Sequence, residues 1–445
     1  MAELCVCSVL VTGANRGLGL GLVQHFLRLP NPPQWIFATC RDPNGQRAQE
    51  LQNLASKHPN LVIIGLEVAN PASIKAAAAK VGEHLGGSGL NLLINNAGIV
   101  KPNSLDNETP EDMIQVYTTN TVGPLLMGQL SCSKAAIINM SSIGGSIASS
   151  YGWELMQITS YRCSKAALNM LSRCQSLAYK EHGILCVALH PGWVQTDMGS
   201  YAGHTPPVTV DDSVQGMLKV LSSLSEKDTG AFLDWEGNVL PCLSMPTQCP
   251  LFQELQNLAS KHPNIIIIPL EVSDPTSIKA AAAKVGEHLG GSGLNLLINN
   301  AGIAKPNSLD NETPEDMIQV YTTNTVGPLL MGQLSCSKAA IINMSSYAGS
   351  IEDMYVWDFG QIVSYRCSKA ALNMLSRCQS LAYKEHGILC VALHPGWVQT
   401  DMGAGGSYKP PLTVEDSVQG MLKVLSSISE KETGAFLDWE GKVMP

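Results

Sequence analysis

The first half of the chain alternates between short apolar runs and stretches whose apolar residues recur at helical spacing. The predicted strands are 6–11, 35–39, 61–66, 90–94, 136–140 and 184–189. The predicted helices are 17–27, 74–85 and 160–182. Runs that are apolar on both faces and alternate with helices predict a parallel sheet covered on both sides, which is a doubly wound α/β fold.

This pattern then occurs a second time, with its beginning missing. Residues 51–241 recur with scattered changes as residues 255–445, and residues 74–99 recur unchanged as 278–303. So long a period indicates a duplicated domain rather than a solenoid of small units.

We therefore expect a complete domain at 1–241, a linker at 242–250 and a truncated copy at 251–445. The copy lacks the first strand, its helix and the second strand. In the Rossmann strand order 3-2-1-4-5-6, a ligand binds between strands 1 and 4. Without strands 1 and 2, strand 3 would lie about 14 Å from strand 4 unless the sheet closes up. The copy is not expected to bind a dinucleotide in the normal way.

Composition narrows the classes of function. Of the 445 residues, 45% are apolar and 15% charged, as in soluble globular proteins. The net charge of −9 and the lack of a basic stripe argue against a nucleic-acid partner. No apolar run approaches the roughly 20 residues that span a bilayer, and no basic region precedes the first strand, so we expect a cytoplasmic protein. The thirteen cysteines show no paired CxxC spacing and no acidic or histidine cluster has metal spacing, so free thiols and no metal are expected.

A glycine-rich loop, TGANRGLG, follows the first predicted strand and opens the first predicted helix. Glycines let the backbone approach a pyrophosphate, and the helix amino terminus offers free N–H donors. In this context a dinucleotide site is favoured over an ordinary tight turn. The candidate cofactor-binding residues of the loop are Gly13, Asn15, Arg16, Gly17, Leu18 and Gly19. The loop has no second copy in the chain.

Two arginines indicate which dinucleotide would bind. Sites for NAD usually place an acid after strand 2 on the ribose 2′-hydroxyl, whereas arginine accommodates the 2′-phosphate of NADP. Here Arg41 follows the second predicted strand, and Arg16 projects from the glycine loop. Both suit a bidentate phosphate contact. Asp42 is the counter-argument, but it lies one residue later. Either arginine alone is typical of a solvated surface cation; together they favour NADPH.

Tyr161 and Lys165 lie four residues apart, on one face of a predicted helix. A phenol with a pKa of ~10 is a poor acid or base at neutral pH. A neighbouring ammonium group and an oxidised nicotinamide would lower that pKa toward the working range. Alone, this spacing is typical of a surface pair; the surrounding SKAALN and the upstream NMSS make it far more specific. The ten letters YRCSKAALNM return at Tyr365 and Lys369.

Together these motifs resemble the short-chain dehydrogenase/reductase family, in particular its C-factor and sniffer-type carbonyl reductases. The motifs that carry the resemblance are TGANRGLG, ATCRDP, LLINNAGI, NTVGPLLM, IINMSS, YRCSKAALN and HPGWVQTDM. The resemblance covers residues 4–241 and, less the amino-terminal part of a domain, residues 251–445.

The resemblance implies a role for each matching residue. Tyr161 would protonate the substrate carbonyl oxygen as hydride arrives from the nicotinamide, and Ser142 would hydrogen-bond that oxygen. Lys165 would bind the nicotinamide ribose and lower the pKa of the tyrosine, and Asn120 would hold a water that links the lysine to solvent. The other implied cofactor contacts are Glu67 and Val68 near the adenine, Asn95, Ala97 and Gly98 on the adenosine-ribose side, and Pro191, Gly192, Val194 and Thr196 at the nicotinamide end.

The chain departs from the family pattern in two places. Ser142 lies only 22 positions after Asn120 (142 − 120), where the family usually has a longer helix and a loop. A shorter helix could weaken the homodimer surface that this family often builds from it. The truncated copy keeps Ser346, Tyr365 and Lys369, which we expect to be idle without a bound hydride donor.

Three hypotheses follow. The leading one is an oxidoreductase that transfers hydride from NADPH to a small aldehyde, ketone or quinone, acting through the first copy. The second is a catalytically silent NADPH-binding sensor or interaction scaffold. The third is a fusion of tandem neighbours whose second copy lost its first segment, which predicts poor folding of 251–445.

Overall fold

The structure is a computed structural model, and it divides into two compact units that are described separately. Unit 1 comprises Met1–Pro102, Gln115–Pro241 and Leu309–Pro314; unit 2 comprises Asn103–Ile114, Cys242–Ser308 and Glu315–Pro445. The residues described are 6–129, 136–148, 152–153, 156–240, 261–290, 292–333, 339–352, 357, 361–400, 402 and 410–444. The expected linker at 242–250 and the expected start of the second copy at 251 lie outside them.

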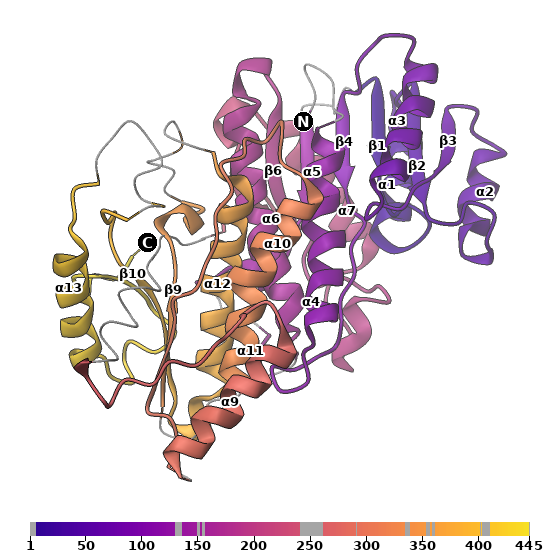
Figure 1. The fold of residues 1–445 in the computed structure, drawn as a ribbon. Helices are drawn as coiled ribbons and strands as arrows, with labels where there is room; N and C mark the ends of the chain where they lie inside the picture. The colour runs from indigo at the N-terminus through magenta and orange to yellow at the C-terminus, as the bar shows by residue number, and fades with distance from the viewer. Residues whose placement is uncertain are drawn as a thin grey trace. The chain divides into compact units, whose positions relative to one another are not determined.

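Unit 1 contains a parallel sheet of seven strands in the order β3-β2-β1-β4-β5-β6-β7, part of which is visible in Figure 1. The strands are β1 (Ser8–Val11), β2 (Trp35–Cys40), β3 (Leu61–Gly65), β4 (Leu92–Asn95), β5 (Ala136–Met140), β6 (Leu185–His190) and β7 (Phe232–Asp234). The predicted doubly wound sheet is confirmed. Strand β7 escaped prediction because three residues carry no periodic signal. The strand order reverses between β1 and β4, where Val11 pairs with Ile94.

Some helices of the first repeat begin at side-chain caps that the sequence supplies. The helices of this repeat are α1 (Gly17–Arg28), α2 (Gln49–Ala55), α3 (Pro71–Leu85), α4 (Pro110–Tyr117), α5 (Gly123–Gly128), α6 (Thr159–Ala178) and α7 (Val210–Ser223). The Asn70 side chain accepts hydrogen bonds from the first N–H groups of α3, and Thr209 does the same for α7. None of the described helices is long and apolar enough to cross a membrane.

The main core of unit 1 lies where α1 and α7 pack on the sheet. Leu22 and Phe26 of α1 and Val214 of α7 belong to one buried cluster with apolar residues of β1 and β4. The helices meet at Gly21, because a Cβ there would lie 2.6 Å from the Cγ1 of Val210. This packing places the amino terminus of α1 at the edge of the sheet where strand order reverses.

Unit 2 contains a parallel sheet of four strands in the order β11-β10-β9-β8. Its strands are β8 (Leu296–Asn299), β9 (Ala340–Met344), β10 (Leu389–His394) and β11 (Phe436–Asp438). The helices are α9 (Pro275–Leu289), α10 (Pro314–Tyr321), α11 (Gly327–Gln333), α12 (Val363–Ala382) and α13 (Val414–Ser427). The amino-terminally truncated copy of the same fold is confirmed.

The segment that repeats β3 does not form a strand in unit 2. Residues 265–270 correspond to 61–66 in sequence, yet they have no strand structure. A strand needs a neighbour to bond its N–H and C=O groups, and the residues that would supply β1 and β2 are missing from this copy. The sheet neither closes up across the gap nor keeps a separate third strand.

Candidate active site

Tyr161 and Lys165 lie on successive turns at the start of α6. The Lys165 Nζ is 5.5 Å from the centre of the Tyr161 ring and donates a hydrogen bond to the Met140 carbonyl at 2.7 Å. Met140 ends β5, so this bond ties the helix to the carboxyl end of the central sheet. The pair predicted from spacing therefore faces the edge where α/β sheets bind their ligands.

Burial dominates the protonation of both side chains. It raises the pKa of Tyr161 to about 12, against the smaller opposite effects of a hydrogen bond with Ser142 and of the Arg162 charge. Burial also lowers the pKa of Lys165 to about 7. In the protein alone, Tyr161 therefore holds its proton at neutral pH, and the lysine is near the midpoint of its titration.

Ser142 is held by the short helix that follows β5. Its Oγ accepts a hydrogen bond from the Gly144 N–H at 3.1 Å, and this caps the 3₁₀ turn Ile143–Gly145. A hydrogen bond joins the Ser142 and Tyr161 side chains. On the other side of the pair, Ile158 directly precedes α6 and has a φ of 40°, a left-handed conformation that is strained for a β-branched residue. The chain enters the helix sharply there and sets the direction of Tyr161.

Asn120 lies in a π-helical turn, Thr118–Val122, that joins α4 to α5. Its Oδ1 accepts from the Ile99 N–H at 2.9 Å, and its Nδ2 donates to the Ile99 carbonyl at 2.9 Å and to the Ser164 Oγ at 3.0 Å. A Cβ at Gly98 would lie 3.2 Å from the Asn120 Oδ1 and 3.8 Å from the Lys165 Nζ. Asn120, Gly98 and Lys165 thus lie close together. Such π-helical turns often occur at functional sites.

The glycine loop is fixed to the end of β4 through Thr12. The Thr12 Oγ1 accepts from the N–H groups of Asn96 and Ala97, each at 2.9 Å, and the Asn96 Nδ2 donates to the Thr12 carbonyl at 2.8 Å. Gly13 has φ of 63° and a Cβ there would be 3.0 Å from the Ala97 Cα. A side chain would therefore both strain this turn and crowd the neighbouring loop.

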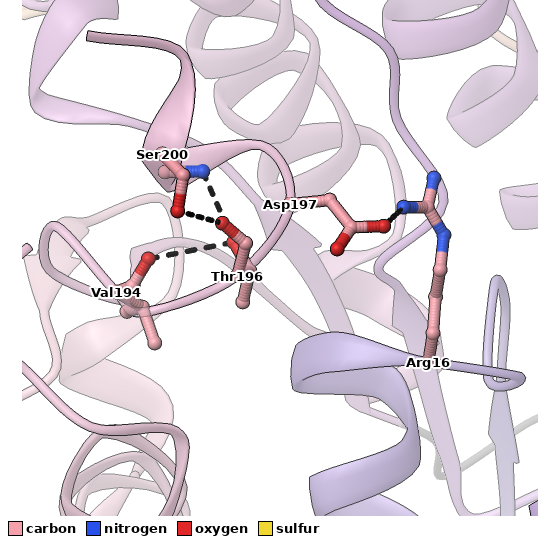
Figure 2. A network of polar contacts seen from close by, with 6 residues as sticks. Arg16, Val194, Thr196, Asp197 and Ser200 are labelled. Carbon is pink, nitrogen blue, oxygen red and sulfur yellow. Dashed lines mark hydrogen bonds and ion pairs between the residues drawn. The ribbon is translucent and has the colours of Figure 1, made fainter. Parts of the chain in front are cut away.

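Two loops approach each other above the amino terminus of α1 (Figure 2). Arg16 of the glycine loop forms an ion pair with Asp197, and a Cβ at Gly17 would lie 3.4 Å from the Thr196 methyl group. Thr196 is held by its own segment: its N–H donates to the Val194 carbonyl at 2.8 Å, and its carbonyl accepts from Ser200. The arginine that the sequence assigns to phosphate is thus engaged by an acid from the segment after β6.

Arg41 and Glu67 lie together at the ends of β2 and β3, with 3.8 Å between Arg41 Nη1 and Glu67 Oε2. Asp42, the acid that could argue for NAD, is engaged in a local turn. Its Oδ1 accepts from the Asn44 N–H at 3.2 Å, and its carboxylate packs so closely that a Cβ at Gly45 would be 2.3 Å from Oδ2. The carboxylate closes a local turn, while the Arg41 side chain is exposed.

The predicted nicotinamide-end residues follow β6 as a fixed loop. The Pro191 carbonyl accepts from the Ser213 Oγ at 2.6 Å, and Gly192, with φ of 87°, lies against the Trp235 ring. Val194 forms an isolated bridge with Val208. These contacts anchor the loop to α7 and to the segment after β7.

The side chains of three expected cofactor residues pack or form hydrogen bonds within unit 1. Leu18 packs against the main core of unit 1, and Val68 is buried beside Gly123. The Asn95 side chain is also buried and donates to the Asn139 Oδ1 at 2.8 Å. Any cofactor contact by Leu18 would therefore use its backbone.

Sequence reasoning missed four residues that organise the site: Thr12, Asn96, Ser164 and Asp197. Each stands next to a residue that was assigned, inside the same motif. The signal that could have found them is their chemistry, because a short polar side chain at a strand end or on a buried helix face must find a partner. No group of three or more metal-binding side chains occurs among the described residues.

Unit 2 repeats the internal contacts of this site, but its tyrosine is covered by apolar side chains. The Lys369 Nζ donates to the Met344 carbonyl at 2.8 Å, and Asn324 bonds Ile303 and Ser368 as Asn120 bonds its partners. Tyr365, however, is only 1% exposed and belongs to an apolar cluster. The tyrosine of unit 1 is more exposed than its copy.

The pattern of the short chain dehydrogenase family matches residues 8–206 and again residues 239–408. The chain belongs to this family. Two matches in one chain also support the tandem duplication. As a member of the family, the protein is an oxidoreductase by class.

Individual relatives resemble one copy at a time. The short chain dehydrogenase gsfK of Penicillium aethiopicum is 34% identical over a 258-residue alignment that covers 52% of this chain and 98% of that protein. The C-signal protein of Myxococcus xanthus is 36% identical over 34% of this chain and 92% of its own. Among solved structures, the NADPH-bound carbonyl reductase from chicken fatty liver is 68% identical and has a TM-score of 0.52. The match covers 54% of this chain and 100% of the reductase chain.

Proposed function

We propose that this protein is an NADPH-dependent carbonyl reductase that acts through unit 1 on small aldehydes, ketones or quinones. The observation that carries the proposal is the grouping of Tyr161, Ser142 and Lys165 at the carboxyl end of β5, with Lys165 bonded to the Met140 carbonyl. The likeness to a carbonyl reductase that was solved with NADPH supports the same reaction.

Bound NADPH would supply a hydride to the carbonyl carbon. Tyr161 donates its phenolic proton to the carbonyl oxygen, so that the product is an alcohol. Burial raises the pKa of Tyr161 to about 12, so the phenol is still protonated at neutral pH when the substrate binds. The Ser142 hydroxyl stabilises the charge that develops on the oxygen. Lys165, with Asn120 beside it, returns a proton to Tyr161 from the solvent side.

The residues around the amino terminus of α1 and the end of β2 fit the dinucleotide. The close approach of Gly13 to Ala97 leaves backbone rather than side chains at the amino terminus of α1, which suits a pyrophosphate. Arg41 is exposed at the end of β2, and Asp42 is committed to its own turn. An exposed arginine in place of an acceptor for the ribose hydroxyls favours the 2′-phosphate.

In this proposal the catalytic domain ends at residue 241, residues 242–250 link it to the copy, and 251–445 is a truncated, silent repeat. Ser346, Tyr365 and Lys369 keep their arrangement but lack the glycine loop. The apolar cover over Tyr365 also closes the place where a carbonyl would meet its hydroxyl.

A matched pair of variants tests the proposal. Consumption of NADPH is followed with a panel of small aldehydes, ketones and quinones for the full chain, Tyr161→Phe and Tyr365→Phe. The first variant should lose at least about a hundredfold in kcat, because general acid catalysis contributes this much, and should still bind NADPH. The second should keep full activity. A wild-type chain that binds NADPH but reduces no carbonyl would overturn the enzyme and favour the silent sensor or scaffold.

A further inference from the structure

Five apolar side chains of unit 2 are exposed although their counterparts in unit 1 are largely covered. Val418 is 41% exposed where Val214 is 0%, Leu422 is 58% exposed where Leu218 is 8%, and Ile298 is 44% exposed where Ile94 is 1%. Leu296 and Val414 show the same contrast with Leu92 and Val210. We call the set Leu296, Ile298, Val414, Val418 and Leu422 the open face.

The contrast comes from what is missing, because the local sequences are nearly the same. Strands β4 and β8 both read LLIN, and α7 and α13 differ only at Asp211 against Glu415. In unit 1, β1 pairs with β4 and α1 packs on α7, with Gly21 against Val210 and Val214. Unit 2 has lost both covering elements.

The open face combines a strand edge with a helix stripe. Among the described residues, β8 pairs only with β9, so its other edge keeps free N–H and C=O groups. Val414, Val418 and Leu422 recur every four residues and form one stripe along α13. Met421, Val424 and Leu425 pack α13 onto β9 and β10, which fixes the stripe beside the sheet. An edge of this kind is a template for pairing with another chain.

We propose that the open face binds the open face of a second copy of this chain, in a two-fold symmetric dimer with β8 antiparallel to β8. The symmetry axis is then perpendicular to the sheet. Each face of the sheet in one copy therefore continues into the same face in the other copy. Both α13 helices therefore lie on the same face, antiparallel to each other. The paired strands satisfy their free edges, and Leu296 and Ile298 of the two copies lie side by side between the two stripes.

The charged residues of α13 support a second copy of this chain as the partner of the open face. Glu415 directly follows Val414, and Lys423 directly follows Leu422, so both lie on the same flank of the stripe and both are exposed. In the two-fold arrangement, Lys423 of one copy lies at the same end of the interface as Glu415 of the other. The same pairing occurs again across the axis, so the charged flank is self-complementary.

Another possible partner is the segment that unit 2 lacks, supplied as β1 and α1 of a second copy. This segment would fit the open face less well. Val9, Leu22, Val23 and Phe26 of that segment are buried in the main core of their own unit. Moving them to unit 2 of another chain would uncover as much apolar surface as it covers.

The test is the oligomeric state of the full chain, measured by sedimentation equilibrium over a range of concentrations. Wild type should dimerise, and Val418→Glu or Leu422→Glu should raise the dissociation constant at least tenfold. Val443→Glu is the matched control, since Val443 is 63% exposed in unit 2 and outside the open face, and it should change nothing. A monomeric wild type, or a dimer that tolerates Val418→Glu, would overturn the proposal.

A charge exchange distinguishes a specific interface from general stickiness. Glu415→Lys should weaken the dimer, and adding Lys423→Glu to the same chain should restore it. Hydrogen exchange gives a second measurement, because the β8 amides should become protected as wild-type concentration rises but not in Val418→Glu. Open-ended association that ignores the charge exchange would count against the two-fold dimer. NADPH binding reports that unit 1 of each variant remains folded.

Discussion

Arg16 of the glycine loop forms an ion pair with Asp197 of the segment that follows β6 (Figure 2). From the sequence, Arg16 is also expected to bind the 2′-phosphate of NADPH. The two anions therefore compete for one guanidinium group. Because both side chains are largely exposed, the competition is weak, and it affects only the phosphate-bearing dinucleotide.

Asp197→Asn should tighten NADPH binding by about two- to fivefold, since exposed ion pairs are worth at most about 1 kcal/mol. NADH lacks the 2′-phosphate, so its affinity should not change. Titration calorimetry measures both, with Glu181→Gln, an exposed acid in unit 1, as the control for net charge. An equal change for the two dinucleotides would contradict the competition.

Arg41→Gln should weaken NADPH binding by about ten- to a hundredfold, the worth of a charge-assisted hydrogen bond, and leave NADH binding nearly unaltered. Arg28→Gln is the matched control because Arg28 lies at the other end of α1 from the glycine loop. The same titration should give one site per chain. Two sites would mean that unit 2 binds the dinucleotide as well.

The stability of unit 1 should depend on pH through Lys165. Burial lowers the pKa of Lys165 from 10.5 to about 7, so between those values the folded protein binds fewer protons than the unfolded chain. The contribution of this lysine to the free energy of unfolding therefore rises with pH across that window.

Lys165→Met removes this dependence. Melting curves at several pH values between 7 and 10 should show wild type gaining on the variant as pH rises. Lys369→Met should behave alike, because burial also lowers the pKa of Lys369 to about 7. Lys180→Met, at an exposed position, should show no such trend. A difference between Lys165→Met and wild type that is constant with pH would refute the assignment.

Ser164→Ala should lower both stability and turnover. It removes one of the two acceptors of the Asn120 Nδ2, which costs about 1–3 kcal/mol at a buried site, and loosens Asn120 beside Lys165. We expect a melting point lower by a few degrees and kcat at least about threefold lower, with NADPH affinity unchanged. Ser368→Ala breaks the same bond in unit 2 and should cost stability without activity. Equal loss of activity in both variants would mean that unit 2 takes part in catalysis.

Much of the site could be predicted from the sequence because its motifs are local. The spacing of Tyr161 and Lys165 places them on one helix face, and the glycine loop predicts the amino terminus of α1. The partners across the fold were not predictable. Asp197 is 181 positions from Arg16, and nothing in a local pattern says that the two loops meet. The role of Asp42 was open for the same reason, since only its turn shows where the carboxylate points.

The sequence by itself determined the fold class, the strands β1 to β6, the duplication and the loss of the first strands from the second copy. It did so because periodicity, turn residues and repeats are properties of neighbouring positions. Tertiary structure alone decided burial. Val214 and Val418 have almost the same neighbours in sequence, yet α1 covers the first, and the second is exposed. Residues 61–65 form β3, whereas 265–269 form no strand, because a strand exists only where another chain segment bonds its edge.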